Sequence, residues 1–250
     1  MNDNGMYLGG PRSRAEPKIT CCVFAWNEVV TLRGVVDDLL SALRALNTTF
    51  ELLIIDDGSS DGTSEVADRA AADNRGVVRV IHHGDNRGLG GVYRTGFESA
   101  HGTYLTFFPA DGQFPAELLA RFFPLVERYD MVLGNLPKRT GSLIGAVLSR
   151  TERLLYAGMF GRIPRLEGVF IMRREILSNI ELKSRGRGWT VLWELLIRAH
   201  RRGYRTTGCE IYMQNRIDGT SKVNNVRTIA ANLQQLWELR GMLKDERDAR

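Results

Sequence analysis

The sequence predicts an α/β fold with a mostly parallel, Rossmann-like sheet flanked by helices. Two observations predict it. Short apolar segments of strand length alternate with amphipathic segments of helical period between residues 18 and 133, and turns rich in Asp, Gly and Ser follow several of the apolar segments. This alternation is typical of sheets whose strands are connected by helices. In such sheets, ligands bind at the edge where the strands end.

The first half supplies strands and helices in turn. The apolar, partly β-branched runs predict strands at residues 18–25, 50–55, 77–82, 103–109 and 131–133. Apolar positions three and four apart, together with turn residues before them, predict helices at 28–46, from Ser60 or Asp61 to 74, at 88–100, and from Pro115. The first of these helices is expected to be capped by Asn27.

The second half is less regular. Its predicted elements are a helix at 143–160, a strand at 167–172, a helix at 189–201, a strand-like segment at 204–215, a basic loop at 216–222 and a last helix with Val226, Ile229, Leu233, Leu236 and Trp237 on one face. Because no linker separates the halves, we expect one compact domain, with residues 136–250 packed as a subdomain on the sheet formed by 18–135. Residues 1–17 are expected to be a disordered leader.

The composition restricts the function classes. Lys and Arg exceed Asp and Glu by 34 − 29 = 5, which permits an anionic ligand or a membrane surface. Three cysteines favour reduced thiols in the cytoplasm over a disulfide framework or a zinc site. No apolar run approaches the roughly 18 uncharged residues of a membrane span. We therefore expect any membrane contact to be peripheral, at the inner face.

The strand at 103–109 ends in Ala110-Asp111-Gly112-Gln113. Asp111 and Gln113 are two residues apart, so on an extended backbone they would point the same way. A carboxylate and an amide oxygen suit Mg²⁺ or Mn²⁺, which in turn suits a diphosphate. Taken alone, the segment fits a simple Asp-Gly turn equally well.

Three other segments are candidates for ligand contacts. The acidic turn around Asp57 can accept hydrogen bonds from a ribose or a base, although helix capping explains part of it. The run that begins at Gly88, preceded by Arg87, can attract a phosphate or simply permit close packing; it does not match the dinucleotide fingerprint. The loop from Arg216 to Lys222 can hold phosphate oxygens or be a solvated turn. Adjacent His82 and His83 point to opposite faces, so neither is assigned a metal.

Together these segments resemble the inverting glycosyltransferases of the GT-A fold, family 2. The resemblance is carried by the motifs Trp26-Asn27-Glu28, Asp56 to Thr63, Asn86 to Gly90, Ala110 to Gln113 and Glu167 to Phe170, by Glu194, and by Arg216 with Ser221 and Lys222. It extends from residue 18 to about 225 and is greatest to polyprenyl (dolichyl) phosphate mannosyl and glucosyl synthases. Each motif is weak, but their combination and order are specific.

The resemblance implies a role for each matching residue. Nucleotide contacts would come from Ala25, Trp26, Glu28, Asp57, Arg87, Gly88 and Ala110, and metal ligands from Asp111 and Gln113. Phosphate or acceptor contacts would come from Lys138, Arg139, Arg216, Ser221 and Lys222. Asp111, Glu194, Arg216 and Lys222 would be the catalytic set. Residues 18–135 would then bind the nucleotide sugar and residues 136–250 the acceptor.

Two positions depart from the family pattern. Pro109 stands where the first acid of Asp-x-Asp belongs, which leaves one carboxylate for the metal. Leu136 stands where an arginine often follows the fifth strand, and Lys138 or Arg139 could replace it. The departure at Pro109 bears on how tightly the protein binds a metal ion. The departure at Leu136 bears on which acceptor the protein uses.

The resemblance implies transfer of a hexosyl group from a UDP- or GDP-sugar to a polyprenyl phosphate. A soluble acceptor, such as a natural product or saccharide, and a non-catalytic nucleotide-sugar-binding protein stay open as alternatives. Nucleic acid is not an expected partner. The helix expected at 143–160 could rest on a bilayer, although burial against the sheet fits it somewhat better.

Overall fold

The computed structural model describes residues 16–137, 158–161, 163–215 and 234–244. Its strands, in chain order, are β1 (Ile19–Ala25), β2 (Phe50–Asp56), β3 (Val78–His82), β4 (Tyr104–Pro109), β5 (Met131–Asn135), β6 (Phe170–Arg173) and β7 (Thr206–Glu210). Its helices are α1 (Leu32–Ala45), α2 (Thr63–Asp73), α3 (Gly88–Ser99), α4 (Leu118–Val126), α6 (Glu175–Asn179) and α7 (Thr190–Arg201). Residues 234–244 form a further helix. The mixed α/β fold with a mostly parallel sheet is as predicted.

The strands of the described residues form one sheet in the order β3-β2-β1-β4-β6-β5-β7. β1 pairs in parallel with β2 and β4, and β2 pairs in parallel with β3. β6 is antiparallel to both of its neighbours, β4 and β5, whereas β5 and β7 are parallel. The sequence analysis places the second half on top of the sheet, but β6 and β7 are part of the sheet itself. Strand pairing of this kind is decided by long-range contacts that a local pattern does not contain.

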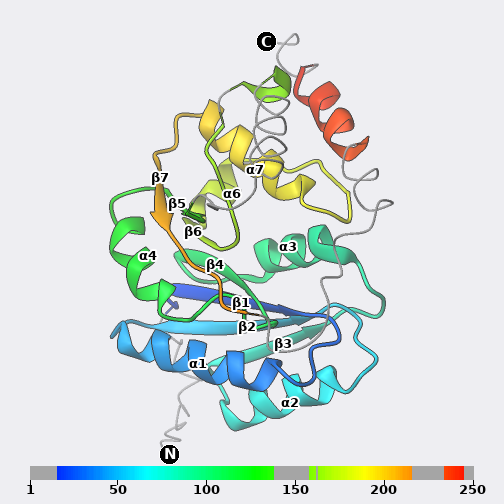
Figure 1. Ribbon diagram of the computed structural model, residues 1–250, viewed down its shortest axis with the longest axis vertical. Helices are drawn as coiled ribbons and strands as arrows, with labels where there is room; N and C mark the ends of the chain where they lie inside the picture. Colours follow the sequence, from blue (N-terminus) through cyan, green and yellow to red (C-terminus); the bar gives the residue numbers. More distant parts are fainter. Residues whose placement is uncertain (1–15, 138–157, 162, 216–233, 245–250) are drawn as a thin grey trace, which may run out of the picture.

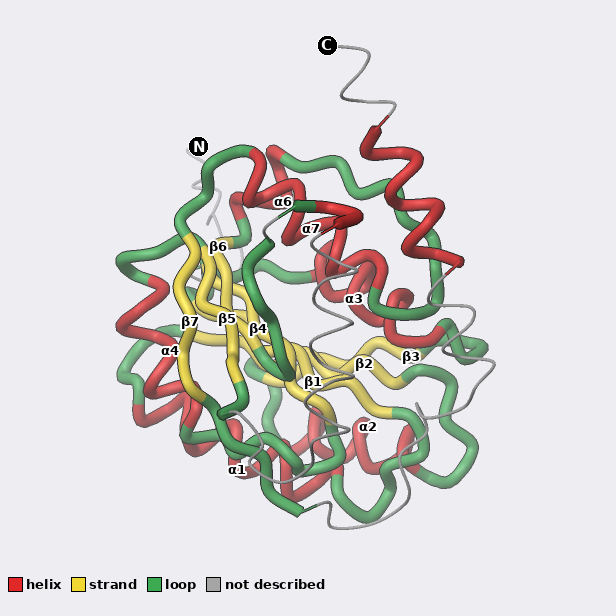
Figure 2. Tube along the Cα trace, turned by 45° about the horizontal axis from the view of Figure 1, so that its top comes forward, coloured by secondary structure: helices red, strands yellow, loops and turns green. Residues whose placement is uncertain are grey.

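Helices cover both faces of the sheet. Figures 1 and 2 show α1 and α2 on one side and α3, α6 and α7 on the other. Alternate residues of the buried strands point to opposite faces, so Cys21 belongs to the core beneath α1 and Cys22 to the core beneath α3 and α7. Both cysteines are free, as predicted, and fully buried.

Several element boundaries differ from the prediction. Asn27 does not cap α1: the helix begins at Leu32, and Asn27 has a positive φ of 53°. In the helix at 234–244, Leu236, Leu239 and Leu243 are buried, whereas Trp237 is 60% exposed, so the prediction that Trp237 belongs to the apolar face is wrong. Most of the helix expected at 143–160 and the residues Val226, Ile229 and Leu233 lie outside the described residues.

A buried polar network closes the amino-terminal edge of the sheet. Glu51 accepts hydrogen bonds from Thr20 Oγ1 (2.7 Å), His101 N (2.8 Å) and Arg79 Nε (3.0 Å). Burial by itself would raise the pKa of Glu51, but these hydrogen bonds outweigh it and hold the pKa below its ordinary value of 4.5. The network joins β1, β2, β3 and the start of β4 at the edge opposite to the loops described below.

Glu51→Gln should therefore destabilise the protein without changing its chemistry. We expect a loss of about 1–2 kcal/mol at pH 7, because a charge-assisted network loses its charge. The folded-state pKa is lowered, so this contribution is present at neutral pH and lost as the pH falls below 4.5. Urea unfolding of both proteins at pH 7 and pH 3.5 measures it. Equal stability of the two proteins at pH 7 would contradict the assignment.

Candidate active site

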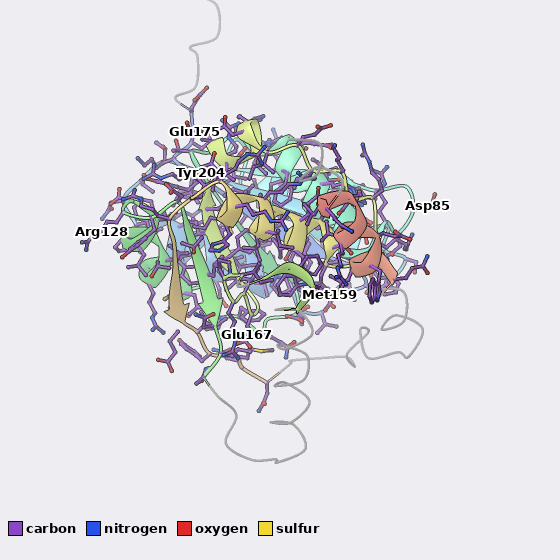
Figure 3. The ribbon with its side chains drawn as sticks, turned by 90° about the horizontal axis from the view of Figure 1, so that it is seen from above. Asp85, Arg128, Met159, Glu167, Glu175 and Tyr204 are labelled. Atoms are coloured by element: carbon purple, nitrogen blue, oxygen red, sulfur yellow. The ribbon has the colours of Figure 1, made fainter. Side chains whose placement is uncertain are left out.

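The predicted site residues gather where β1, β2 and β4 end. Asp57 N donates to Ala25 O (2.9 Å), and Ala110 N donates to Phe24 O (2.9 Å), which continues the strand pairing one residue beyond the sheet. Ala25, Asp57 and Ala110 therefore lie at adjacent strand ends, as expected for a nucleotide site in a parallel sheet. In Figure 3, Glu167 lies at the edge where β5 and β7 end, and Glu175 and Tyr204 lie at the opposite edge.

The loop after β1 is joined to the loop after β2 by hydrogen bonds. Asn27 N donates to Ser59 Oγ (2.9 Å), Ser60 N donates to Asn27 Oδ1 (2.9 Å), and Glu28 N donates to Thr63 Oγ1 (2.8 Å). The side chain of Asn27 thus connects two loops, which explains its left-handed backbone and why it does not cap α1. Trp26 is 40% exposed at this rim, which places an indole where a base could reach it.

Each carboxylate of the acidic turn at Asp56, Asp57 and Asp61 accepts hydrogen bonds from within the protein. Asp61 Oδ1 accepts a hydrogen bond from Thr63 N (3.1 Å), but the N-cap residue of α2 is Gly62, so the predicted cap at Ser60 or Asp61 is wrong. Asp56 accepts from Ser59 N (3.1 Å) and Ser64 Oγ (2.5 Å). Burial would raise the pKa of Asp56, but these hydrogen bonds, with one from His82, outweigh it and lower the pKa. Asp56 is therefore a charged group inside the turn rather than a ligand-facing one.

Asp57 joins β2 to the start of α3. Its carboxylate accepts hydrogen bonds from Arg87 N (2.8 Å) and Gly88 N (2.9 Å), and Oδ1 lies 2.7 Å from His83 Nδ1. The side chain is only 5% exposed. Arg87 and Gly88, both predicted nucleotide contacts, are thereby fixed beside Asp57. A direct contact of the Asp57 carboxylate with a nucleotide stays a prediction.

The glycines at the start of α3 permit a close approach of another loop. Gly88 has a φ of +71°, and a Cβ there would lie 2.7 Å from Arg187 O. A Cβ at Gly90 would collide with the carbonyl oxygen of Gly186. The glycine run therefore receives the loop before α7. The sequence analysis assigned no role to that loop, although its alternation of basic residues and glycines (residues 183–188) was a readable signal.

Asp111 lies in a turn just after β4. The strand ends at Pro109, Gly112 has a φ of +71°, and Asp111 Oδ1 accepts from Gln113 N (3.1 Å). The backbone here is not extended. The argument that strand alternation makes Asp111 and Gln113 point the same way is therefore wrong. Asp111 is 8% exposed, and Gln113 is half-buried.

At this turn, the carboxylate available for a metal ion would be that of Asp111. Among the described residues, no three His, Cys, Asp or Glu side chains gather as a metal-binding group. Mg²⁺ is commonly held by one or two carboxylates, with substrate phosphates and water completing its shell. One carboxylate beside an amide therefore fits an ion that arrives with a diphosphate, and it does not fit a permanently bound ion.

Glu194 is not arranged as a proton acceptor for a substrate. Its side chain has no exposed surface, and its oxygens accept from Lys183 N (3.0 Å), Ser184 N (2.7 Å) and Arg198 Nε (2.7 Å). With these donors, the carboxylate holds the loop before α7. These contacts do not favour a direct catalytic role for Glu194, which the family resemblance implies.

Glu167 occupies the same edge from the side of β5 and β6. Glu167 N donates to Gly134 O (2.8 Å), its Oε2 accepts from Leu136 N (2.8 Å), and its Oε1 pairs with Arg165. It thereby fixes the chain directly after β5. The predicted phosphate-binding and acceptor residues Lys138, Arg139, Arg216, Ser221 and Lys222 lie outside the described residues.

No helix within the described ranges has both the length and the apolar character needed to cross a bilayer. Comparison with known sequences gives the family. The sequence model described as "Glycosyl transferase family 2" matches residues 20–180, more than half of the chain.

Two curated relatives are similar over most of the chain. An undecaprenyl-phosphate 4-deoxy-4-formamido-L-arabinose transferase of Yersinia pestis (strain Pestoides F) is 26% identical over 216 residues, which are 85% of this chain and 64% of that protein. Glycosyltransferase AglD of Haloferax volcanii is 29% identical over 237 residues, 86% of this chain and 36% of that protein. The chain thus spans less than two thirds of the relatives it matches.

Solved structures show the same fold. Glucosyl-3-phosphoglycerate synthase from Mycobacterium tuberculosis, in complex with Mn²⁺, UDP and phosphoglyceric acid, has a TM-score of 0.63 at 20% identity and covers 88% of this chain and 78% of its own. Mannosyl-3-phosphoglycerate synthase from Rubrobacter xylanophilus has a TM-score of 0.64 at 18% identity, with 92% and 75% covered. The expected GT-A architecture is confirmed, and this chain belongs to glycosyl transferase family 2.

Proposed function

We propose that the protein transfers a hexosyl group from a UDP- or GDP-sugar to a polyprenyl phosphate, with inversion at the anomeric carbon. The observation that supports this most is the position of Asp111, directly after β4 and beside the ends of β1 and β2, in a chain of family 2. The similarity to the Yersinia relative, an undecaprenyl-phosphate transferase, supports the class of acceptor.

The donor would lie along the edge from β2 to β4. The residues proposed to contact its nucleotide are Ala25, Trp26, Glu28, Asp57, Arg87, Gly88 and Ala110. The joined loops after β1 and β2 give that edge a fixed shape, so little order has to be gained when the donor binds. Complexes of the M. tuberculosis neighbour with UDP support a nucleotide at this edge.

Asp111 and Gln113 would hold Mg²⁺ or Mn²⁺ together with the donor diphosphate. When bound, the ion supplies positive charge to the leaving diphosphate. Asp111 would orient that charge, and Arg216, Ser221 and Lys222 would bind the phosphate oxygens. Asp111 already carries a hydrogen bond from Gln113 N, which fixes its carboxylate before any ligand arrives.

The acceptor phosphate would attack the anomeric carbon from the face opposite to the leaving diphosphate. Its oxygen is already ionised near neutral pH, so the step needs no strong general base. This agrees with the buried, fully engaged carboxylate of Glu194, which would act by holding its loop rather than by taking a proton. Lys138 and Arg139 are proposed to contact the acceptor, and a peripheral membrane contact would bring the lipid to them.

A soluble phosphorylated acceptor is a second candidate. The M. tuberculosis neighbour was solved in complex with phosphoglyceric acid, and this chain is similar in fold to most of its length. Both acceptors carry a phosphate group, so the same basic side chains could bind either one, but attack by the hydroxyl group of a soluble acceptor would also need a general base.

Asp111→Asn should lower kcat about 100-fold or more, because a group that orients charge in the transition state is lost. Release of UDP or GDP from the sugar nucleotide, measured with added Mn²⁺, gives the rate. Asp38→Asn on the exposed face of α1 is the matched control and should leave the rate unchanged. Chelation by EDTA should abolish turnover, and Mn²⁺ or Mg²⁺ should restore it. Normal turnover of Asp111→Asn would contradict the metal assignment.

The acceptor class can be tested by partition. The protein is incubated with a radiolabelled sugar nucleotide and either undecaprenyl phosphate or phosphoglycerate. We expect the label to enter the organic phase with undecaprenyl phosphate, since the product is a lipid. Label that stays in water and depends on phosphoglycerate would favour the soluble acceptor, and nucleotide binding without transfer to either would refute both.

A further inference from the structure

The loop between α6 and α7, residues 183–188, has the sequence Lys-Ser-Arg-Gly-Arg-Gly. Side chains of other elements hold its backbone by hydrogen bonds. Glu194 accepts from the N–H groups of Lys183 and Ser184, as described above. Arg94 Nη1 donates to the carbonyl oxygens of Ser184 (3.3 Å) and Gly186 (3.1 Å). A buried carboxylate and a half-buried guanidinium thus hold the first four residues of a short, polar loop.

This loop is pressed against the start of α3, at the candidate active-site edge. Gly90 N donates to Arg187 O (2.8 Å), and Arg187 Nη2 donates to Asn86 Oδ1 (2.7 Å). A Cβ at Gly90 would also lie 2.9 Å from Gly188 O, so the approach requires glycine there. The loop therefore has one position relative to Arg87 and Asp57.

Positive charge accumulates where loop and helix meet. Arg87, Arg185 and Arg187 are exposed, and within the described part of the chain none of them forms an ion pair. Burial lowers the pKa of Arg94, and the nearby charge of Arg185 lowers it further, against the opposite effect of Glu98. A protein that holds like charges together in a rigid loop without acidic partners stores repulsion that an anion would relieve.

A second observation at the same loop also indicates that a hydrogen-bonding ligand belongs here. The side-chain oxygen of Ser184 is buried and finds no hydrogen-bond partner among the residues that the structure describes. Buried hydroxyl groups are nearly always hydrogen-bonded, and an exception needs an explanation.

We propose that residues 183–188, together with Arg87, form a phosphate-binding element in which Arg185 and Arg187 contact a phosphate group of a substrate. Planar guanidinium groups bind phosphate oxygens in pairs, which suits two arginines separated by one glycine. The inference rests on the proposed transfer reaction for the identity of the substrate. The donor diphosphate and the acceptor phosphate offer the same chemistry.

The test is the binding of inorganic pyrophosphate, UDP, GDP and farnesyl phosphate to Arg185→Gln, Arg187→Gln and the double variant, by titration calorimetry. Each substitution should weaken binding of pyrophosphate about tenfold, because a charge-assisted hydrogen bond is lost. Arg69→Gln, which removes an exposed charge from α2 on the other face of the sheet, is the matched control and should bind like the wild type.

The different probes distinguish the donor diphosphate from the acceptor phosphate as the bound group. Weaker binding of UDP and GDP assigns the element to the donor diphosphate, and weaker binding of farnesyl phosphate assigns it to the acceptor. Wild-type affinity of the double variant for every probe, or no binding of any probe to the wild type, would overturn the inference. Weaker binding in a protein that transfers no sugar would leave the inference standing and remove the proposed function. If the double variant transfers sugar with unchanged kcat/KM, the proposed function stands and the phosphate-binding role of the loop is refuted.

Discussion

The carboxylate of Asp57 is the interaction on which the candidate site depends. It lies one residue beyond β2 and accepts the backbone N–H groups of Arg87 and Gly88, so the end of a central strand is joined directly to the start of α3. Negative charge at a helix N-terminus is favourable, because the first backbone N–H groups of a helix have no partner within it. Since α3 is placed in this way, Gly90 meets the loop before α7, and that loop in turn meets Glu194 and Arg94. A chain of local hydrogen bonds thus sets the geometry of the whole edge.

The two edges of the sheet use buried acids for different purposes. At the amino-terminal edge, Glu51 accepts hydrogen bonds from β1, from β3 and from the segment before β4, and this network supports the fold. At the carboxyl-terminal edge, Asp56, Asp57 and Glu194 are also engaged by donors, and each one positions a loop. Asp111 is the acid of this edge that lies directly after β4, where its carboxylate accepts a hydrogen bond from Gln113 N of its own turn. In the proposed reaction, Asp111 would serve an ion that is delivered with its substrate, while the other acids supply a rigid frame.

Much of the fold could be predicted because its signals are local. The apolar runs at Ile19–Ala25 and Tyr104–Pro109 are strands, and the amphipathic period of Thr190–Arg201 is a helix, as expected. The insertion of β6 between β4 and β5 could not be predicted, because pairing over long sequence separations leaves no mark on the period of either strand. The role of Asn27 was missed for a similar reason: its partner is Ser60, in another loop. The alternation argument for Asp111 and Gln113 failed because the backbone leaves the extended region after Pro109.

The sequence by itself determined the α/β class, the family resemblance and the segments that would meet at one sheet edge, since residue type, order and spacing carry that information. Only the tertiary structure decided what each polar group does there. Glu194 and Asp57 are acids at expected positions, yet their oxygens are occupied by backbone N–H groups from other elements. Arg185 and Arg187 received no role from the sequence, and they became candidates because the fold packs their loop against α3. The sequence gives the chemical type of each side chain, but the packing of distant elements determines which groups it contacts.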